Sequence, residues 1–230
     1  MEKRLKNPRK VLIRHPGSIK YYFLFRKLSN YTMVEYDALY QMRNLILDVD
    51  SNNVKGAIVE TGCWNGGCGA YMAYVSKQNG SNRQTWLFDS FHGLPEATDN
   101  DEFFAKKVGL PLDNLSGHLK ASIENVESIS SQLGVKNNTH IIKGWFKDTI
   151  PLNKKNIGKI AILRLDGDLY DSTKIVLDEL YSSVSNGGYV VVDDFPFPGC
   201  RKAIFDFFSE QGIAPYIKDG GKHQRTFWQK

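Results

Sequence analysis

Strand-like and helix-like segments alternate along most of this chain, and this alternation limits the folds open to it. Apolar segments typical of buried strands are found at 57–60, 85–89, 139–142, 160–166 and 189–193, with a weaker pair near 216–217 and 226–228. Helices are predicted at about 34–49, 67–78, 118–133, 171–184 and 199–211. Because strands separated by helices form parallel sheets, we predict an α/β fold with a doubly wound, mostly parallel sheet.

The length of the chain favours one domain. Its 230 residues are 41% hydrophobic, enough for one sizeable core. We expect a basic N-terminal extension over 1–30 and a single domain over 31–230. Two segments, 91–117 and 144–157, break the alternation. The first begins at the carboxyl end of the second strand, where open α/β sheets bind ligands. We therefore expect a lid at about 91–117 rather than a loop without a function.

Charge is distributed unevenly along the sequence. Residues 1–28 hold nine Lys or Arg and one acid, which leaves 21 basic and 24 acidic residues in the remainder. This mildly acidic body argues against nucleic acid as a partner. Residues 19–27 mix aromatic and cationic side chains, as interfacial segments do. Two alternatives therefore remain for the basic extension: weak contact with a membrane surface, or a solvated arm that ends in a helix docked on the core.

The sequence contains neither a secretory signal nor an apolar run of membrane-spanning length, so we expect a cytoplasmic protein without a transmembrane segment. The cysteines are Cys63, Cys68 and Cys200, which form neither a CxxC pair nor an even set. We therefore predict that they are reduced packing residues. The oligomeric state stays open, with a homo-oligomer among the alternatives.

A glycine-rich turn, Glu60 to Gly67, joins the first predicted strand to its helix. Glycines let a backbone pass close to a ligand, and the following helix N-terminus favours a negative group such as a carboxylate. The turn lacks the G-x-G-x-x-G pattern, which disfavours a dinucleotide. Asp89 ends the second strand, where an acid can bind ribose hydroxyls, although a helix-capping or loop acid is the alternative. Together these features predict a nucleoside cofactor, on whose adenine Trp145 and Phe146 could stack.

Carboxylates crowd at the ends of the fourth and fifth predicted strands. Asp166 and Asp168 follow the fourth strand, and Asp193 and Asp194 follow the fifth. Neighbouring strands lie about 5 Å apart, so these acids should converge, which is electrostatically costly unless a cation is present. Oxygen ligands without a nearby Cys or His favour Mg²⁺ over zinc. We predict that Asp166, Asp193 and Asp194 hold the metal.

The fourth acid, Asp168, is the predicted catalytic base. A metal acts on a substrate hydroxyl as a Lewis acid, and a nearby carboxylate takes the proton. Spacing alone leaves open whether Asp166 and Asp168 exchange these roles. In the alternative interpretation, the acids cap helices or pair with Arg164 and Lys174. Asp171 fits the pattern of a helix N-cap, and we assign it a structural role.

Taken together, these motifs resemble the macrocin O-methyltransferase family, whose members methylate sugar hydroxyls of macrolide and aminocoumarin antibiotics. The resemblance rests on Glu60-Thr61-Gly62 with Trp64 and Gly66-Gly67, Asp89-Ser90-Phe91 with Gly93-Leu94-Pro95, Gly144 to Thr149, Asp166 to Tyr170 with Ser172-Thr173, Gly187-Gly188-Tyr189, and Asp193-Asp194. These stretches run in family order from about Thr32 to Trp228.

The resemblance implies a class I, Rossmann-like methyltransferase with a seven-stranded sheet. Such an enzyme uses S-adenosylmethionine (SAM) and Mg²⁺ to methylate a hydroxyl of a sugar or glycosylated metabolite, so the partner is a small-molecule or glycan acceptor. The cofactor contacts are then expected at Glu60, Thr61, Gly62, Trp64, Gly66, Asp89, Ser90, Gly144, Trp145 and Phe146.

The sequence departs from the family in two places. Asn65 stands where the family often has arginine, and the segment between Pro95 and Ser122 looks shorter than in the antibiotic enzymes. A macrolide sugar is therefore not carried over as the substrate. The alternatives are a non-catalytic SAM-binding protein and an O-methyltransferase that acts on a catechol-like hydroxyl. A phosphoryl transferase is disfavoured because no G-x-x-x-x-G-K-[ST] motif occurs.

Overall fold

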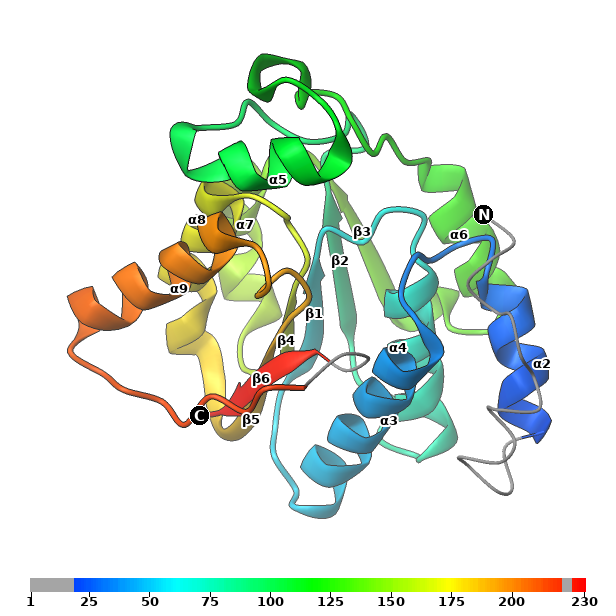
Figure 1. Ribbon diagram of the computed structural model, residues 1–230. Coiled ribbons are helices and arrows are strands. Elements are labelled where there is room, and N and C mark those ends of the chain that lie inside the picture. Colours follow the sequence, from blue (N-terminus) through cyan, green and yellow to red (C-terminus); the bar gives the residue numbers. More distant parts are fainter. Residues whose placement is uncertain (1–18, 221–224) are drawn as a thin grey trace.

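The computed structural model describes residues 19–220 and 225–230, so most of the predicted basic extension lies outside the described residues. A central sheet has helices on both faces (Figure 1). Its strands are β1 (Ala57–Thr61), β2 (Thr85–Asp89), β3 (Thr139–Lys143), β4 (Ile160–Leu165), β5 (Val184–Val192) and β6 (Thr226–Gln229). They lie in the order β3-β2-β1-β4-β5-β6, with only β6 antiparallel to its neighbour. The predicted doubly wound, mostly parallel sheet is confirmed.

The predicted strand count was wrong, because the described residues form six strands and not seven. The chain near 216–217, which was expected to add a strand, touches β6 through a single antiparallel bridge between Lys218 and Phe227. Two backbone hydrogen bonds of 2.8 and 3.0 Å form that bridge. A neighbouring glycine at 220 and an aspartate at 219 weaken strand formation there, so the pairing does not extend.

Successive side chains of the strands point to opposite faces of the sheet, and each face has its own hydrophobic core. Ile58 and Ile162 pack on one face, and Val59 and Leu163 pack on the other. The first face is covered by α3 (Tyr36–Ser51) and α4 (Gly67–Gln78), with α2 (Ile19–Leu28) and α6 (Ile123–Gln132) packed beside them. The second is covered by α7 (Phe146–Ile157), α8 (Tyr170–Leu180) and α9 (Pro198–Gln211). None of these described helices is both long and apolar enough to cross a bilayer.

The direction of winding reverses between β1 and β4. From β1 the chain adds β2 and then β3 on one side, and it then returns to place β4 and β5 on the other. Ligands of open α/β sheets bind outside the carboxyl ends of the strands at such a switch point. The turn that follows β1 and the loop that follows β4 therefore lie side by side at the place where the fold favours a ligand.

The segment 144–157 is largely helical, contrary to the prediction that it breaks the alternation. Helix α7 covers Phe146–Ile157 although Pro151 lies inside it. Proline removes one helical hydrogen bond, but Ile150 and Ile157 are buried against the sheet. Burial of this apolar face offsets the unfavourable local propensity. The predicted reduced state of the cysteines fits, since Cys63, Cys68 and Cys200 are buried and free.

The segment 91–117, predicted as a lid, contains more regular structure than expected. It forms helix α5 (Glu102–Val108) and two 3₁₀ turns, Asp99–Asp101 and Leu112–Asn114, over the end of the sheet (Figure 1). We call residues 91–117 the cover segment. Its Leu94, Phe104, Ala105 and Leu115 form a small core with Leu169 from the loop after β4. The helix predicted from about 118 begins only at Ile123.

A buried carboxylate, Asp101, fastens the cover segment to the second face. Its Oδ1 accepts a hydrogen bond of 2.9 Å from the backbone N–H of Tyr170, at the start of α8. Its Oδ2 accepts bonds from the N–H and hydroxyl of Thr98, at 3.0 and 3.1 Å. Because Tyr170 follows Leu169 directly, the cover segment and the loop after β4 are anchored at the same point.

Replacing Asp101 with alanine should free the cover segment. Hydrogen bonds to a charged group contribute about 1.5–3 kcal/mol each, so proteolysis within 91–117 should accelerate by at least about tenfold. Limited trypsin digestion followed by mass spectrometry measures this rate. Asp113→Ala, in the exposed 3₁₀ turn of the same segment, is the matched control and should leave cleavage unchanged. Equal rates in the two variants would contradict the anchor.

Candidate active site

A cavity of about 840 Å³ opens at the carboxyl ends of the strands. Its walls come from the turn after β1, the end of β2, residues 144–147, the acidic ends of β4 and β5, and the cover segment. This volume lies within the range of about 300–1,000 Å³ that is usual for small-molecule sites. The predicted cofactor end and the predicted acidic cluster therefore share one cavity.

Most of the expected cofactor residues line this cavity. Those that do are Glu60, Gly62, Trp64, Asp89, Ser90, Gly144, Trp145 and Phe146. Thr61 and Gly66 are not among its lining residues. The buried Thr61 hydroxyl donates to the carbonyl of Arg164 at 3.3 Å, and Gly66 caps α4 against Val126 with φ of 80°. These two residues shape the turn.

Gly62 is required by the close approach of two strand ends. Its φ is 87°, and a Cβ built on it would lie 1.7 Å from the carbonyl oxygen of Asp166. The N–H of Asp166 donates to the Thr61 carbonyl at 2.9 Å, which holds the turn after β1 directly beside the acidic loop after β4. Only glycine fits this contact, so the sequence motif has a direct steric cause.

Asp89 organises the turn from the neighbouring strand. Its Oδ2 accepts the N–H of Trp64 at 2.8 Å, and its Oδ1 accepts the N–H of Phe91 at 2.7 Å. Both donors have the left-handed backbone conformation that is rare for bulky residues, with φ of 48° and 56°. Burial raises the pKa of Asp89, and these two N–H groups oppose that shift. Each carboxylate oxygen can still accept a second bond from a ligand.

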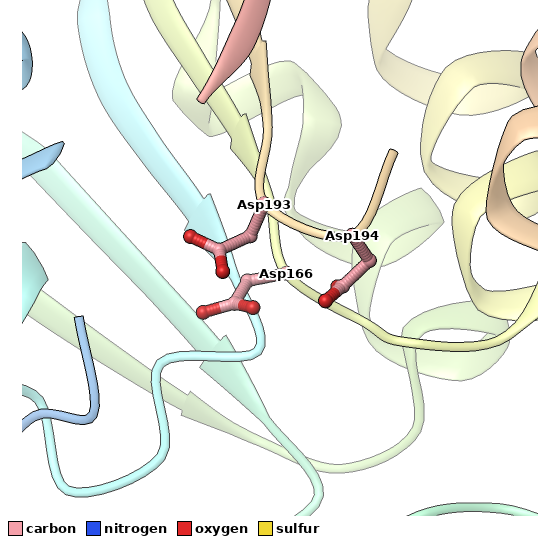
Figure 2. Close-up of side chains that lie close together, drawn as sticks. All are labelled: Asp166, Asp193 and Asp194. Atoms are coloured by element: carbon pink, nitrogen blue, oxygen red, sulfur yellow. The ribbon is translucent and has the colours of Figure 1, made fainter. Parts of the chain in front are cut away.

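The three predicted metal ligands lie together. Asp166, Asp193 and Asp194 each offer a carboxylate oxygen within 4.8 Å of the others, and Figure 2 shows them converging from the ends of two adjacent strands. The predicted base, Asp168, lines the same cavity. Its N–H donates to Asp194 Oδ2 at 3.0 Å, and its φ of 60° is left-handed, which aspartate tolerates.

Arg164 lies beneath this cluster and is 1% exposed. One guanidinium nitrogen, Nη1, donates to Glu60 Oε1 at 2.7 Å and to Asp166 Oδ2 at 2.6 Å, while Nη2 contacts Asp193 Oδ1. From the sequence, Arg164 was expected only as an alternative partner of the acids. A charged residue within a buried apolar strand was the signal for a larger role.

The other predicted alternative partner, Lys174, does not reach the cluster. It pairs with Asp178 and Glu210 on the outer surface, at 2.7 and 2.8 Å. The N-cap prediction for Asp171 was wrong, because α8 begins at Tyr170 with Leu169 as its N-cap. Asp171 lies in the first turn of the helix and lines the cavity.

Arg225 is a second cation at the site, and the sequence analysis missed it. Its Nε donates to Asp193 Oδ1 at 2.7 Å. The cluster thus contains the acids Glu60, Asp166, Asp168, Asp193 and Asp194 against two arginines, which gives a net charge of −3 if every group is ionised. This imbalance favours a bound cation.

Burial and mutual repulsion affect the individual acids differently. Burial raises the pKa of Asp166 to about 7, with the neighbouring Asp193 adding to the shift and Arg164 opposing it. Burial and nearby carboxylates also raise the pKa of Asp168 and of Asp194. Burial disfavours ionised Asp193 too, but Arg164 and Arg225 outweigh it and lower the pKa of that group. Asp193 is therefore the acid that stays ionised most readily.

One oxygen of each predicted ligand faces no protein donor within residues 19–220 and 225–230. The arginines contact Asp166 Oδ2 and Asp193 Oδ1, and a backbone N–H contacts Asp194 Oδ2. The second oxygen of each carboxylate is left for another positive group. This donor set consists only of oxygens, which suits Mg²⁺.

Comparison with known proteins bears on this site. The family model described as macrocin O-methyltransferase matches residues 26–230. A tetracenomycin-C rhamnosyl 4′-O-methyltransferase of Streptomyces olivaceus is 34% identical over 82% of this chain and 72% of its own. Demethyldecarbamoylnovobiocin O-methyltransferase of Streptomyces niveus is 34% identical over 85% of this chain and 76% of its own.

A solved structure agrees with these sequence relatives. The O-methyltransferase NovP is 33% identical, with a TM-score of 0.76, over 87% of this chain and 82% of its own. The fold and the site together define a Rossmann-like methyltransferase whose cofactor end and acidic cluster share one cavity. More narrowly, the chain belongs to the macrocin O-methyltransferase family. The family resemblance of the sequence is confirmed.

Gly62→Ala should separate the two strand ends at the cavity. The left-handed backbone costs about 1–2 kcal/mol and the steric overlap adds about 1–3 kcal/mol, so urea unfolding should show a loss of about 3 kcal/mol. Gly80→Ala is the matched control, since its φ of 85° is similar and nothing lies within 4 Å of its Cβ. A loss at Gly62 no larger than at Gly80 would contradict the close-approach argument.

Proposed function

We propose that this chain transfers the methyl group of SAM to a hydroxyl of a sugar or glycosylated small molecule, with the help of Mg²⁺. The observation that carries the proposal is that the oxygen-only acidic cluster and the glycine turn with Asp89 line the same cavity. Membership of an O-methyltransferase family supports the same reaction.

The cofactor occupies the end of the cavity formed by β1 and β2. Asp89 accepts hydrogen bonds from the ribose hydroxyls with the lone pairs that the backbone leaves free. The amino end of α4 favours the carboxylate of the methionine part. Trp145 and Phe146 line the cavity where an adenine ring would stack, beside Gly144 with its φ of 140°.

Asp166, Asp193 and Asp194 would hold Mg²⁺ through the carboxylate oxygens that accept no hydrogen bond from the described residues. When bound, the cation supplies Lewis acidity that makes an acceptor hydroxyl easier to ionise. Arg164 and Arg225 keep Asp193 ionised and fix its orientation, so the ligand is ready before any cation arrives.

Asp168 takes the proton of the acceptor hydroxyl. It lies on the same loop as Asp166 and lines the cavity, which puts a further carboxylate beside the predicted metal ligands. The ionised oxygen then forms a bond to the methyl carbon as the bond from that carbon to the sulfonium sulfur breaks, leaving S-adenosylhomocysteine (SAH). The protein contributes mainly by holding both reactants in line.

Cavity chemistry favours a neutral acceptor with an apolar part. Eight acids line the cavity against Lys147 and Arg225, so an anionic acceptor such as a sugar nucleotide is repelled. The lining also includes apolar side chains, three of them from the cover segment: Met33, Leu94, Phe104, Val108, Leu119 and Ile175. A sugar attached to an apolar aglycone fits both features. The cytoplasmic location, the basic extension, the lid role of 91–117 and the oligomeric state stay predictions.

Calorimetric titration with SAH tests the cofactor half of the proposal, and titration with Mg²⁺ tests the metal half. Micromolar SAH binding and a saturable Mg²⁺ site are expected, followed by methyl transfer in a screen of neutral glycosides. Binding of SAH without a Mg²⁺ site or turnover would instead support a non-catalytic SAM-binding protein. Absence of SAH binding would refute the proposal.

Asp193→Asn should lower kcat/KM by about a thousandfold, because metal-assisted ionisation supplies several kcal/mol to the reaction. SAH affinity should stay within about threefold, since Asp193 follows β5 and Asp89 ends β2, with β1 and β4 between them. Methyl transfer from labelled SAM measures the first quantity, and calorimetry measures the second. Asp178→Asn, an exposed acid on α8, is the control. Full activity in Asp193→Asn would remove the metal assignment.

Asp89→Ala should instead weaken SAH binding by about ten- to a hundredfold. The substitution removes charge-assisted hydrogen bonds of about 1.5–3 kcal/mol and releases the N–H groups of Trp64 and Phe91. Calorimetry checks this, while Mg²⁺ affinity of the same variant should change little. Unchanged SAH affinity would refute the ribose role.

A further inference from the structure

Gln41, on helix α3, holds the backbone of Arg225 through two hydrogen bonds. The buried side chain of Gln41, on α3, donates through Nε2 to the carbonyl of Arg225 at 2.8 Å. Its Oε1 accepts the backbone N–H of Arg225 at 2.7 Å. One amide side chain therefore fixes both backbone polar groups of a residue 184 positions away. The sequence analysis gave Gln41 no role.

Strand register explains why Arg225 reaches the acidic cluster. In the antiparallel pair of β5 and β6, Val192 lies opposite Thr226. One further step along both chains places Arg225 beside Asp193, the first residue after β5. The guanidinium is 19% exposed, and its Nε contacts the same oxygen, Asp193 Oδ1, that Arg164 contacts. Two arginines thus converge on one oxygen and leave Oδ2 turned to other partners.

We propose that Arg225 is a positioning residue for the metal site and that Gln41 positions Arg225 in turn. This inference rests on the proposed function. Arg225 occupies Asp193 Oδ1 and thereby presents Oδ2 to the cation, as partners of metal ligands commonly do, and loss of such partners costs about 10–100-fold in metal affinity. The Gln41 amide fixes the backbone of Arg225 and so restricts the positions open to its guanidinium beside Asp193.

Charge and geometry predict opposite effects here, which makes the proposal testable. If Arg225 acted only through its charge, it would repel Mg²⁺, and disturbing it would strengthen binding. If it acts through position, disturbing it weakens binding. Substitutions that preserve every charge therefore isolate the geometric contribution.

The test compares Gln41→Met and Arg225→Lys with the wild type, and both substitutions leave the net charge unchanged. Mg²⁺ is titrated into the SAH-saturated full-length protein by calorimetry, and SAH affinity is measured separately in EDTA. The matched control is Gln229→Met at the far end of β6, where the amide donates to the Gly187 carbonyl at 3.0 Å. Thermal unfolding of each variant reports its general stability.

Both variants should bind Mg²⁺ about tenfold more weakly, with SAH affinity within about twofold of wild type. Gln229→Met should keep wild-type Mg²⁺ affinity even if its melting temperature falls as far. A Mg²⁺ affinity within twofold of wild type in either folded variant overturns the inference. If Gln41→Met fails to fold, Arg225→Lys decides alone. Absence of Mg²⁺ binding in the wild type would instead refute the metal part of the proposed function itself.

Discussion

The active-site end of this protein depends on the buried guanidinium of Arg164. It joins Glu60 on β1 to Asp166 after β4 and Asp193 after β5, so three neighbouring strands end at one cation. Without that charge, the largely buried carboxylates would repel one another. With it, they converge and still leave an excess of negative charge. The same interaction that stabilises the strand ends therefore also prepares a site for a second cation.

The sequence predicted the general architecture because that depends on local patterns. The alternation of strands and helices set the parallel sheet, and strand ends placed Asp89, Asp166 and Asp193 at one edge without knowledge of any tertiary contact. Family motifs then narrowed the class of enzyme. Where the prediction failed, tertiary contacts decided the outcome. Burial of Ile150 and Ile157 maintains a helix that contains Pro151, and single-sequence patterns do not show what a distant sheet will cover.

Two features of the site depend on tertiary contacts that local sequence patterns do not reveal. Arg225 lies far from the acids in sequence, and only the register of the last strand brings it to Asp193. Thr61 and Gly66 belong to the predicted turn but are not among the residues that line the cavity, because the Thr61 hydroxyl bonds to the Arg164 carbonyl and Gly66 packs against Val126 at the start of α4. Motifs therefore identify which turn forms the site. The register of the strands and the tertiary contacts then determine which residues line the cavity.

The small core that the cover segment shares with Leu169 limits which substitutions the cover segment can accept. Leu169 directly follows Asp168. The core residues of the cover segment therefore also stabilise the loop that carries the predicted base. A cover segment that diverges in evolution, or that is replaced by engineering, must therefore keep an apolar partner for Leu169 and a carboxylate equivalent to Asp101. Cavity-lining residues of the cover segment that lie outside this core, such as Glu96 and Val108, can then vary while the core contacts stay fixed.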